Sequence, residues 1–254
     1  MIDIHCHIIP GIDDGPKTMA ESIELARAAV HEGVHTIIAT PHWNAVFENE
    51  AKAILRLTAE LQEALDHKEI PLTVLPGQEP RIAGEMVMLL ENEVLLPLTG
   101  AGSYIFVEFP FDGVPRYAKQ LFYDLQLAGF VPVIVHPERN VTLREHHSIL
   151  YDFVCSGALT QVTAASLTGR FGKKVQIYSR QLIEANQCHF LASDAHDTVK
   201  RGFHMKEAEA LIQTDWGQVK VDQLRSHAQA VVMQQTIYPE APKAIKKKKW
   251  LGLF

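Results

Sequence analysis

The chain has 254 residues, of which 47% are hydrophobic and 21% charged, and its formal net charge is -6. This composition is close to the average of soluble globular proteins and excludes a disordered, collagen-like or coiled-coil chain. No apolar run approaches the roughly 18 residues of a membrane-spanning helix, and we expect no signal peptide at the N-terminus.

Short apolar runs alternate with longer amphipathic stretches along the chain. We expect strands at 2–8, 36–40, 72–75, 104–109, 131–135, 159–163 and 189–192, because these runs are β-branched or aromatic and nearly all apolar. Helical patterns lie between them at 19–32, 50–67, 84–90, 115–127, 143–155 and 175–185, and residues 203–235 are expected to form helices packed against the outside. Repeated β–α units predict a parallel sheet, and seven of them predict an α/β fold with a seven-stranded β/α barrel in one domain over residues 1–238.

Cysteine and charge usage narrow the class of protein further. The three cysteines, Cys6, Cys155 and Cys188, are widely spaced and form no C-x-x-C pair, which argues against a disulfide framework or a cysteine zinc site and favours the cytoplasm. Residues 243–254 hold five lysines and no acid, so the rest of the chain is more acidic than the net charge suggests. We therefore expect no nucleic-acid binding, which needs a basic face.

Histidine or an acidic residue follows most of the predicted strands. The first strand carries His5 and His7 on one face, and the last is followed by Asp194 and His196 at the same spacing. The intervening strand ends carry further groups of the same kind: His42, Glu79, Glu108 and His136. In a parallel barrel these carboxyl ends meet on one rim, where barrel enzymes place their chemistry. A single histidine there is more often structural, but so many ionisable groups in one place are costly unless they bind metal.

The ligand types indicate a catalytic metal centre. Imidazole nitrogens and carboxylate oxygens without thiolate suit manganese, iron or zinc in an open site. There are more candidate ligands than one ion needs, so two or three ions sharing carboxylates are expected. Such a cluster would activate water near neutral pH and hold a phosphate, which makes phosphate-ester hydrolysis the leading reaction class. Amide hydrolysis or deamination is the chief alternative.

The motifs resemble a known superfamily. H-x-H at the start, T-P-H42, G-Q-E79, H136-P-E-R139 and S-D194-A-H196 are similar to the polymerase-and-histidinol-phosphatase (PHP) superfamily. Within it, D-I-H-C-H-I-I-P-G-I-D-D-G-P resembles the metal-dependent bacterial protein-tyrosine phosphatases of capsule and exopolysaccharide operons. The resemblance covers residues 1 to about 232 and implies a distorted seven-stranded β/α barrel with a centre of two or three ions, usually Mn²⁺.

Carried over by position, the resemblance implies ligands for three ions. The first ion would be held by His5, His7, Glu79 and Asp194. The second would share Glu79 and use Glu108 and His136, and the third would use His42, His196 and Asp14. Other superfamily members often have histidine at the position of Asp14, so its neighbour Asp13 is an alternative.

Two arginines are expected to hold the phosphate. The resemblance implies this role for Arg139 and Arg201, and guanidinium forks match phosphate oxygens bidentately. The alternative is a surface salt bridge. His42 or Asp14 could assist the leaving group. No cysteine is followed by arginine six positions later, which excludes the cysteine-based phosphatase loop, and Cys6 is expected to pack in the core.

The resemblance therefore implies an enzyme that hydrolyses phosphotyrosine on a bacterial tyrosine kinase and so regulates capsular or exopolysaccharide synthesis. A phosphatase of a small molecule such as histidinol phosphate is the alternative, and a non-enzymatic metal-binding protein is a third reading. Residues 239–254 form a tail in which lysines precede an apolar tip ending in Phe254. This pattern suits the inner face of an anionic membrane, with a disordered end or a homo-oligomer contact as alternatives.

Overall fold

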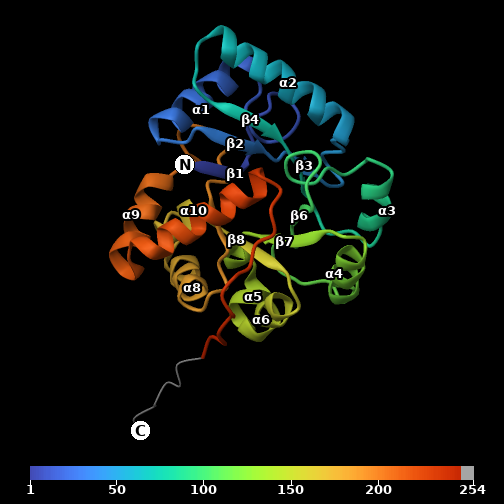
Figure 1. Ribbon diagram of the computed structural model, residues 1–254, viewed down its shortest axis with the longest axis vertical. Helices are drawn as coiled ribbons and strands as arrows, with labels where there is room; N and C mark the ends of the chain where they lie inside the picture. The colour runs from blue at the N-terminus through green and yellow to red at the C-terminus, as the bar shows by residue number, and fades with distance from the viewer. Residues whose placement is uncertain (247–254) are drawn as a thin grey trace.

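A computed structural model describes residues 1–246 of the chain, with helices surrounding a centre of short parallel strands (Figure 1). Each predicted strand overlaps an observed strand, and β3 and β5 are additional short strands. The strands are β1 (Ile2–Cys6), β2 (Thr36–Ala39), β3 (His42–Trp43), β4 (Thr73–Pro76), β5 (Glu79–Pro80), β6 (Tyr104–Val107), β7 (Val131–Val135), β8 (Leu159–Thr163) and β9 (Phe190–Ala192). All pairings between these strands are parallel, as the repeated β–α pattern predicts.

The strands form three sheets rather than one continuous barrel. Their orders are β1-β2-β4, β3-β5 and β6-β7-β8-β9. Isolated bridges, Cys6 with Ala195 and Arg81 with Glu108, connect neighbouring sheets. The α/β domain with parallel sheets is confirmed, whereas the closed seven-stranded barrel is not.

Two interruptions explain the separate sheets. Pro41, which has no amide hydrogen, lies between β2 and β3. Gly77 lies between β4 and β5, where a Cβ atom would come within 2.7 Å of the Ile38 side chain. The ladder therefore stops at both points, and β3 and β5 continue it as a short separate pair.

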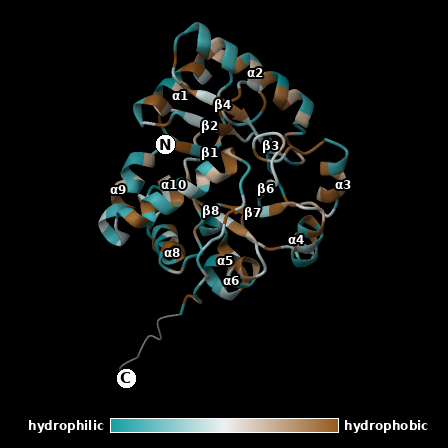
Figure 2. Cartoon of the chain, in the orientation of Figure 1, coloured by the Kyte–Doolittle hydropathy of each residue, from teal (hydrophilic) through white to brown (hydrophobic). Residues whose placement is uncertain are grey.

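The helices turn apolar faces inward and hydrophilic faces outward (Figure 2). They are α1 (Met19–His31), α2 (Ala51–His67), α3 (Met86–Glu91), α4 (Ala118–Leu127), α5 (Val141–Glu145), α6 (His147–Cys155), α7 (Ala164–Leu167), α8 (Lys173–Glu184), α9 (Met205–Trp216) and α10 (Gln218–Val232), with a 3-10 helix at Pro137–Arg139. In α2, Ile54, Leu61 and Leu65 are fully buried at helical spacing. The helix predicted at 143–155 is divided, because His146 has a non-helical backbone.

The apolar interior has two parts. One lies between the strands and the outer helices. The other lies among the strands and includes Ile4, Phe106 and Phe190, together with Val231 of α10. Just beyond α10, the carbonyl oxygen of Gln235 accepts a hydrogen bond from the hydroxyl of Tyr104, the first residue of β6, at 2.7 Å. The last helix thus covers the amino ends of the strands and does more than pack on the outside.

The first part of the predicted tail lies against the body. The Lys243 amide donates to the Ala185 carbonyl at 2.8 Å, and the Gln187 side chain donates to the Lys243 carbonyl at 2.6 Å. Ile245 packs against the larger apolar cluster. Lys246 is exposed, whereas the last three lysines and the apolar tip that were predicted to contact a membrane lie outside the described residues. None of the described helices is both long enough and apolar enough to cross a membrane.

Candidate metal centre

The predicted ligands gather at the carboxyl ends of the strands. They all lie in strands β1, β3 and β5 or in the segments that follow β1, β6, β7 and β9. All but Asp14 and His42 are buried. Three groups bring ligand atoms within 4.8 Å of one another: His5, His7, Glu79 and Asp194; His7, Asp14, His42 and His196; and His42, Glu79 and Glu108.

The first group contains the same residues as the set predicted for the first ion. His5 Nε2 lies 3.4 Å from both Glu79 Oε2 and Asp194 Oδ1. His7 Nε2 lies 3.2 Å from Glu79 Oε2 and 3.4 Å from Asp194 Oδ1. Two imidazoles and two carboxylates therefore point their ligand atoms at one small region.

The other ring nitrogens of these histidines have partners of their own. His5 Nδ1 lies 2.9 Å from Gln161 Oε1, and His7 Nδ1 lies 2.7 Å from Asp13 Oδ2. An acceptor at Nδ1 places the proton there and leaves the Nε2 lone pair free for a metal. Asp13 and Gln161 thus orient the ligands of this centre.

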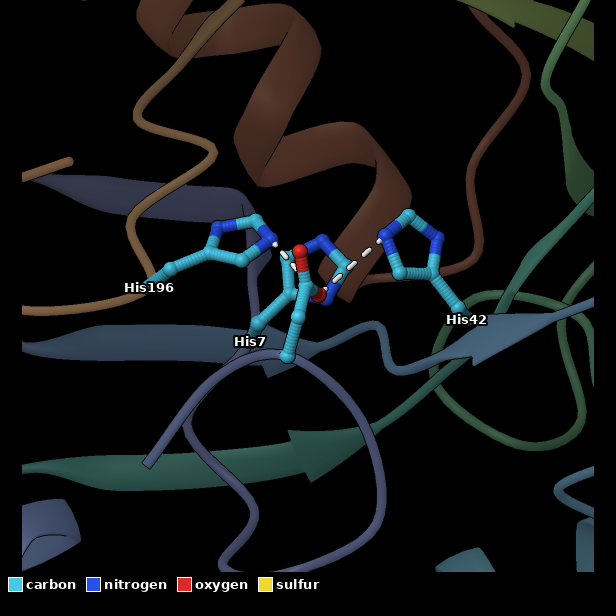
Figure 3. Close-up of side chains that lie close together, drawn as sticks. His7, His42 and His196 are labelled. Carbon is cyan, nitrogen blue, oxygen red and sulfur yellow. Dashed lines mark ion pairs between the residues drawn. The ribbon is translucent and has the colours of Figure 1, made fainter. Parts of the chain in front are cut away.

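Neighbouring aspartates have different surroundings. Asp14 Oδ1 lies 3.2 Å from His196 Nε2 and 3.4 Å from His42 Nε2, and Figure 3 shows His7 between these two histidines. Asp13 is buried and bonds to the far side of His7. The geometry thus gives Asp14 the outward, ligand-like position and Asp13 the supporting one.

The remaining groups differ in part from the predicted sets. His136 Nε2 lies 2.8 Å from Glu79 Oε1 but belongs to none of the three groups. His42 takes its place beside Glu79 and Glu108, while His7 joins the group around Asp14. Glu79, His7 and His42 are each shared by two groups, so the candidate sites are continuous with one another.

Two candidate ligands have left-handed backbones. His136 has φ 33° and Asp194 has φ 53°, a region that costs a residue other than glycine of order 1–3 kcal/mol. His136 directly follows the buried strand β7, and Asp194 is the second residue after the end of β9. The turn directs both side chains back toward the other ligands, and the packed strands hold the strained conformation.

Charges in the centre are strongly coupled. Although burial acts to raise it, the pKa of Glu79 lies well below its usual range because of the neighbouring imidazoles. Burial also acts to raise the pKa of Asp194, but the positive charge of Arg139 outweighs this effect, and the pKa lies well below its usual value. Burial and nearby positive charge lower the pKa of His136 and of His196 to about 4 each. Ionised carboxylates and neutral imidazoles are the forms that bind metal.

Several buried ligand atoms lack a hydrogen bond. They are Glu79 Oε2, His42 Nδ1 and His196 Nε2. Glu79 Oε2 and His42 Nδ1 are 2.9 Å apart without the angles of a hydrogen bond. Buried polar atoms without partners are costly, and cations bound in the ligand groups to which these residues belong would satisfy them. The residues present therefore fit a metal centre with nitrogen and oxygen ligands.

Both predicted phosphate-binding arginines lie at the edge of this centre. Arg201 Nη2 is 3.1 Å from Asp194 Oδ2, and Arg139 Nη1 contacts the same oxygen. Arg201 Nη1 also lies 3.2 Å from Asp14 Oδ2. The loop before Arg201 is held by Asp197, whose Oδ1 accepts the Val199 amide at 2.6 Å. These arginines thus pair with candidate ligands rather than with unrelated surface acids.

Sequence reasoning missed Gln161 and Arg81, and it named Asp13 only as an alternative ligand to Asp14 and not in its supporting role. Asp13 and Gln161 orient the histidines, and Arg81 Nε lies 3.0 Å from Glu108 Oε2. Signals for them exist: a second acid beside Asp14, a lone glutamine within a buried strand, and an arginine two positions after Glu79. Without the fold, none of these signals shows which histidine or acid of the centre the residue contacts.

Cys6 packs in the larger apolar cluster, as predicted. It is fully buried, and its Sγ lies 3.5 Å from the Ala195 carbonyl oxygen. Burial raises the pKa of this thiol well above its usual value, so it is a poor nucleophile.

Comparison with known proteins agrees with this arrangement. Tyrosine-protein phosphatase YwqE of Bacillus subtilis (strain 168) is 49% identical over the whole of both chains. Tyrosine-protein phosphatase CpsB of Streptococcus agalactiae serotype III (strain NEM316) is 27% identical over 88% of this chain and 94% of its own. A solved chain described under crystal structures of YwqE from Bacillus subtilis and CpsB from Streptococcus pneumoniae, unique metal-dependent tyrosine phosphatases, superimposes with a TM-score of 0.95. It is 50% identical and covers 97% of this chain and 100% of its own.

A more distant likeness concerns the fold alone. An organophosphorus hydrolase from Deinococcus radiodurans, 15% identical, matches with a TM-score of 0.57 over 91% of each chain.

The family described as capsular polysaccharide synthesis, CpsB/CapC, matches residues 1–234. The resemblance to metal-dependent tyrosine phosphatases is thus confirmed, and the chain belongs to the CpsB/CapC family.

Proposed function

We propose that this protein is a metal-dependent protein-tyrosine phosphatase acting on a bacterial tyrosine kinase, and that it thereby regulates capsular or exopolysaccharide synthesis. The observation that carries this proposal is the continuous set of three ligand groups with two arginines at its edge. The names of the relatives and the family description support the same activity.

The proposed ligand sets are those that the family resemblance implies, and the geometry supports the first of them most directly. His5, His7, Glu79 and Asp194 would hold one ion, Glu79, Glu108 and His136 a second, and Asp14, His42 and His196 a third. Mn²⁺ is the proposed metal, with iron or zinc as alternatives that the same donor types accept. Bound ions of this kind lower the pKa of a coordinated water and withdraw charge from phosphoryl oxygens.

The protein's own side chains would position the substrate. Arg139 and Arg201 both contact Asp194 Oδ2, and a phosphate dianion beside that oxygen offers them stronger, bidentate partners. Their guanidinium groups would then stabilise charge that develops on the phosphoryl oxygens. His42, a partly exposed candidate ligand, would give a proton to the ester oxygen. Asp14 would not, because the neighbouring imidazoles hold its pKa far below the usual value although burial acts to raise it. Phenolate needs little such help because the pKa of free phenol is about 10.

We also propose that the body and the tail of the chain have different roles. All candidate ligands and both arginines lie within residues 1–238, which would form the phosphatase body in the cytoplasm. Residues 239–254 would form the tail, with peripheral contact at the inner face of the membrane or a contact within a homo-oligomer as its role. A phosphatase of histidinol phosphate remains the alternative activity for the same centre.

Phosphate release from a phosphotyrosine peptide and from histidinol phosphate tests the proposal. Each substrate is assayed with Mn²⁺, after chelation, and with Asp194→Ala, with Asp222→Ala on the exposed face of α10 as the matched control. We expect metal-dependent turnover of the peptide, lost by on the order of 10³-fold in Asp194→Ala and kept in the control. Turnover of histidinol phosphate alone, or full activity of metal-replete Asp194→Ala, would contradict the proposal.

A further inference from the structure

A cleft of about 130 Å³ adjoins the candidate metal centre beside β6 and β7. Glu108 and His136, which are almost fully buried, form part of its wall, and Arg81, Phe111 and Arg139 complete it toward solvent. A substrate phosphate at the centre would therefore have this cleft next to it for the group that it carries.

Phe111 stands at this cleft on a loop that is held firmly. The side-chain amide of Asn140 donates to the carbonyls of Pro110 and Gly113 at 2.7 and 2.9 Å. The amide of Val141 donates to the Phe111 carbonyl at 3.0 Å. Despite these anchors, the Phe111 side chain is 67% exposed. Isolated exposed apolar residues are common, but an exposed phenyl ring on a fixed loop in the wall of a cleft offers a surface to what enters it.

The charge of the cleft is suited to an anion. Arg81 is held by Glu108 and by the Phe109 carbonyl, which its Nη1 contacts at 3.0 Å. Arg139 is a second cation in the lining of the same cleft. An aryl phosphate carries an anionic group and a flat ring. Its phosphate can pair with guanidinium groups, and its ring can pack against a phenyl ring.

We propose that Phe111 binds the tyrosyl ring of the phosphotyrosine substrate and so selects aryl over alkyl phosphate esters. This inference rests on the proposed phosphatase function and adds the residue that recognises the aromatic group. Phe111 contacts the ring and not the reacting atoms, so it acts on substrate binding rather than on the chemical step.

The test compares wild type with Phe111→Ala, Phe111→Trp and the control Tyr123→Ala, an exposed aromatic residue on α4 outside the cleft. KM and kcat are measured for a phosphotyrosine peptide, and the inhibition constant is measured for inorganic phosphate, which has no ring. We expect Phe111→Ala to raise KM about five- to tenfold with little change in kcat. The substitution removes a contact between two aromatic rings, and this contact contributes to substrate binding and not to the chemical step. The phosphate inhibition constant should stay unchanged, and Phe111→Trp and Tyr123→Ala should behave as wild type.

The outcomes separate the two proposals. If wild type does not hydrolyse the peptide with any of the three metals, the proposed function fails. If wild type does so but Phe111→Ala leaves KM unchanged, or raises KM and the phosphate inhibition constant in parallel, the ring-binding role is overturned. Unfolding midpoints of the variants are measured alongside, and equal midpoints show that the kinetic change is local.

Discussion

The two ends of strand β9 show how differently one element is used. At its amino end Phe190 is fully buried among apolar side chains that include Val231 of α10. Just past its carboxyl end Asp194 is buried among three histidines and two arginines. The amino end stabilises the fold through apolar burial. The carboxyl end holds strained backbone and concentrated charge, which cost stability and serve ligand binding.

This contrast predicts opposite consequences for substitutions four residues apart. Phe190→Ala should lower the free energy of unfolding by about 3–5 kcal/mol, because it leaves a cavity in a closed apolar cluster. Asp194→Ala should abolish activity with a smaller loss of stability. Urea unfolding and phosphatase assays on both variants check the comparison. Similar stability losses in the two variants would show that the ends are not functionally distinct.

A supporting residue at the carboxyl end gives an intermediate effect. Asp13→Ala removes the acceptor that bonds His7 Nδ1 at 2.7 Å, so His7 loses its fixed tautomer and orientation. We expect affinity for Mn²⁺ to fall about 10- to 100-fold, as for other partners of metal-binding histidines. Calorimetric titration of the chelator-treated protein measures it, with the exposed Asp222→Ala as control. Unchanged affinity would refute the supporting role.

The smallest effect concerns the histidine at the amino end of β9. Thr160 donates its amide to His189 Nδ1 at 3.0 Å, and burial, with the charge of His227, lowers the pKa of His189 to about 3. The unfolded chain, with a histidine pKa of about 6.5, therefore binds the proton more readily. Stability should be full above that pH and fall as pH decreases from about 6.5 toward 3, by at most about 1.4 kcal/mol per pH unit.

Urea unfolding in chelator from pH 7.5 to 5 measures this dependence. His189→Asn keeps an acceptor for the Thr160 amide but cannot be protonated, so its stability should fall less steeply with decreasing pH than that of wild type. Equal slopes would show that His189 does not contribute to the acid sensitivity.

The contrast also explains what the sequence could predict. Strand positions follow from apolar runs, and the ligands follow from histidines and acids placed where those runs end. The partner of His5 is Gln161, which lies 156 residues away, so only the fold reveals it. The division of the sheets at Pro41 and Gly77 depends on close packing, such as that against Ile38. Local sequence contains the breaking residues but not the distance between the neighbouring strands.

The cover that α10 places over the strands has a consequence for how the chain is made. Asp3, in the first strand, bonds to Ser193, which lies 190 residues later, and the inner apolar cluster is complete only with Val231. During synthesis on the ribosome, the apolar side chains of the inner cluster stay uncovered until residues 218–232 have emerged. Such long-range closure folds slowly and exposes the nascent chain to aggregation. Chaperone protection is therefore most needed just before the last helix is released.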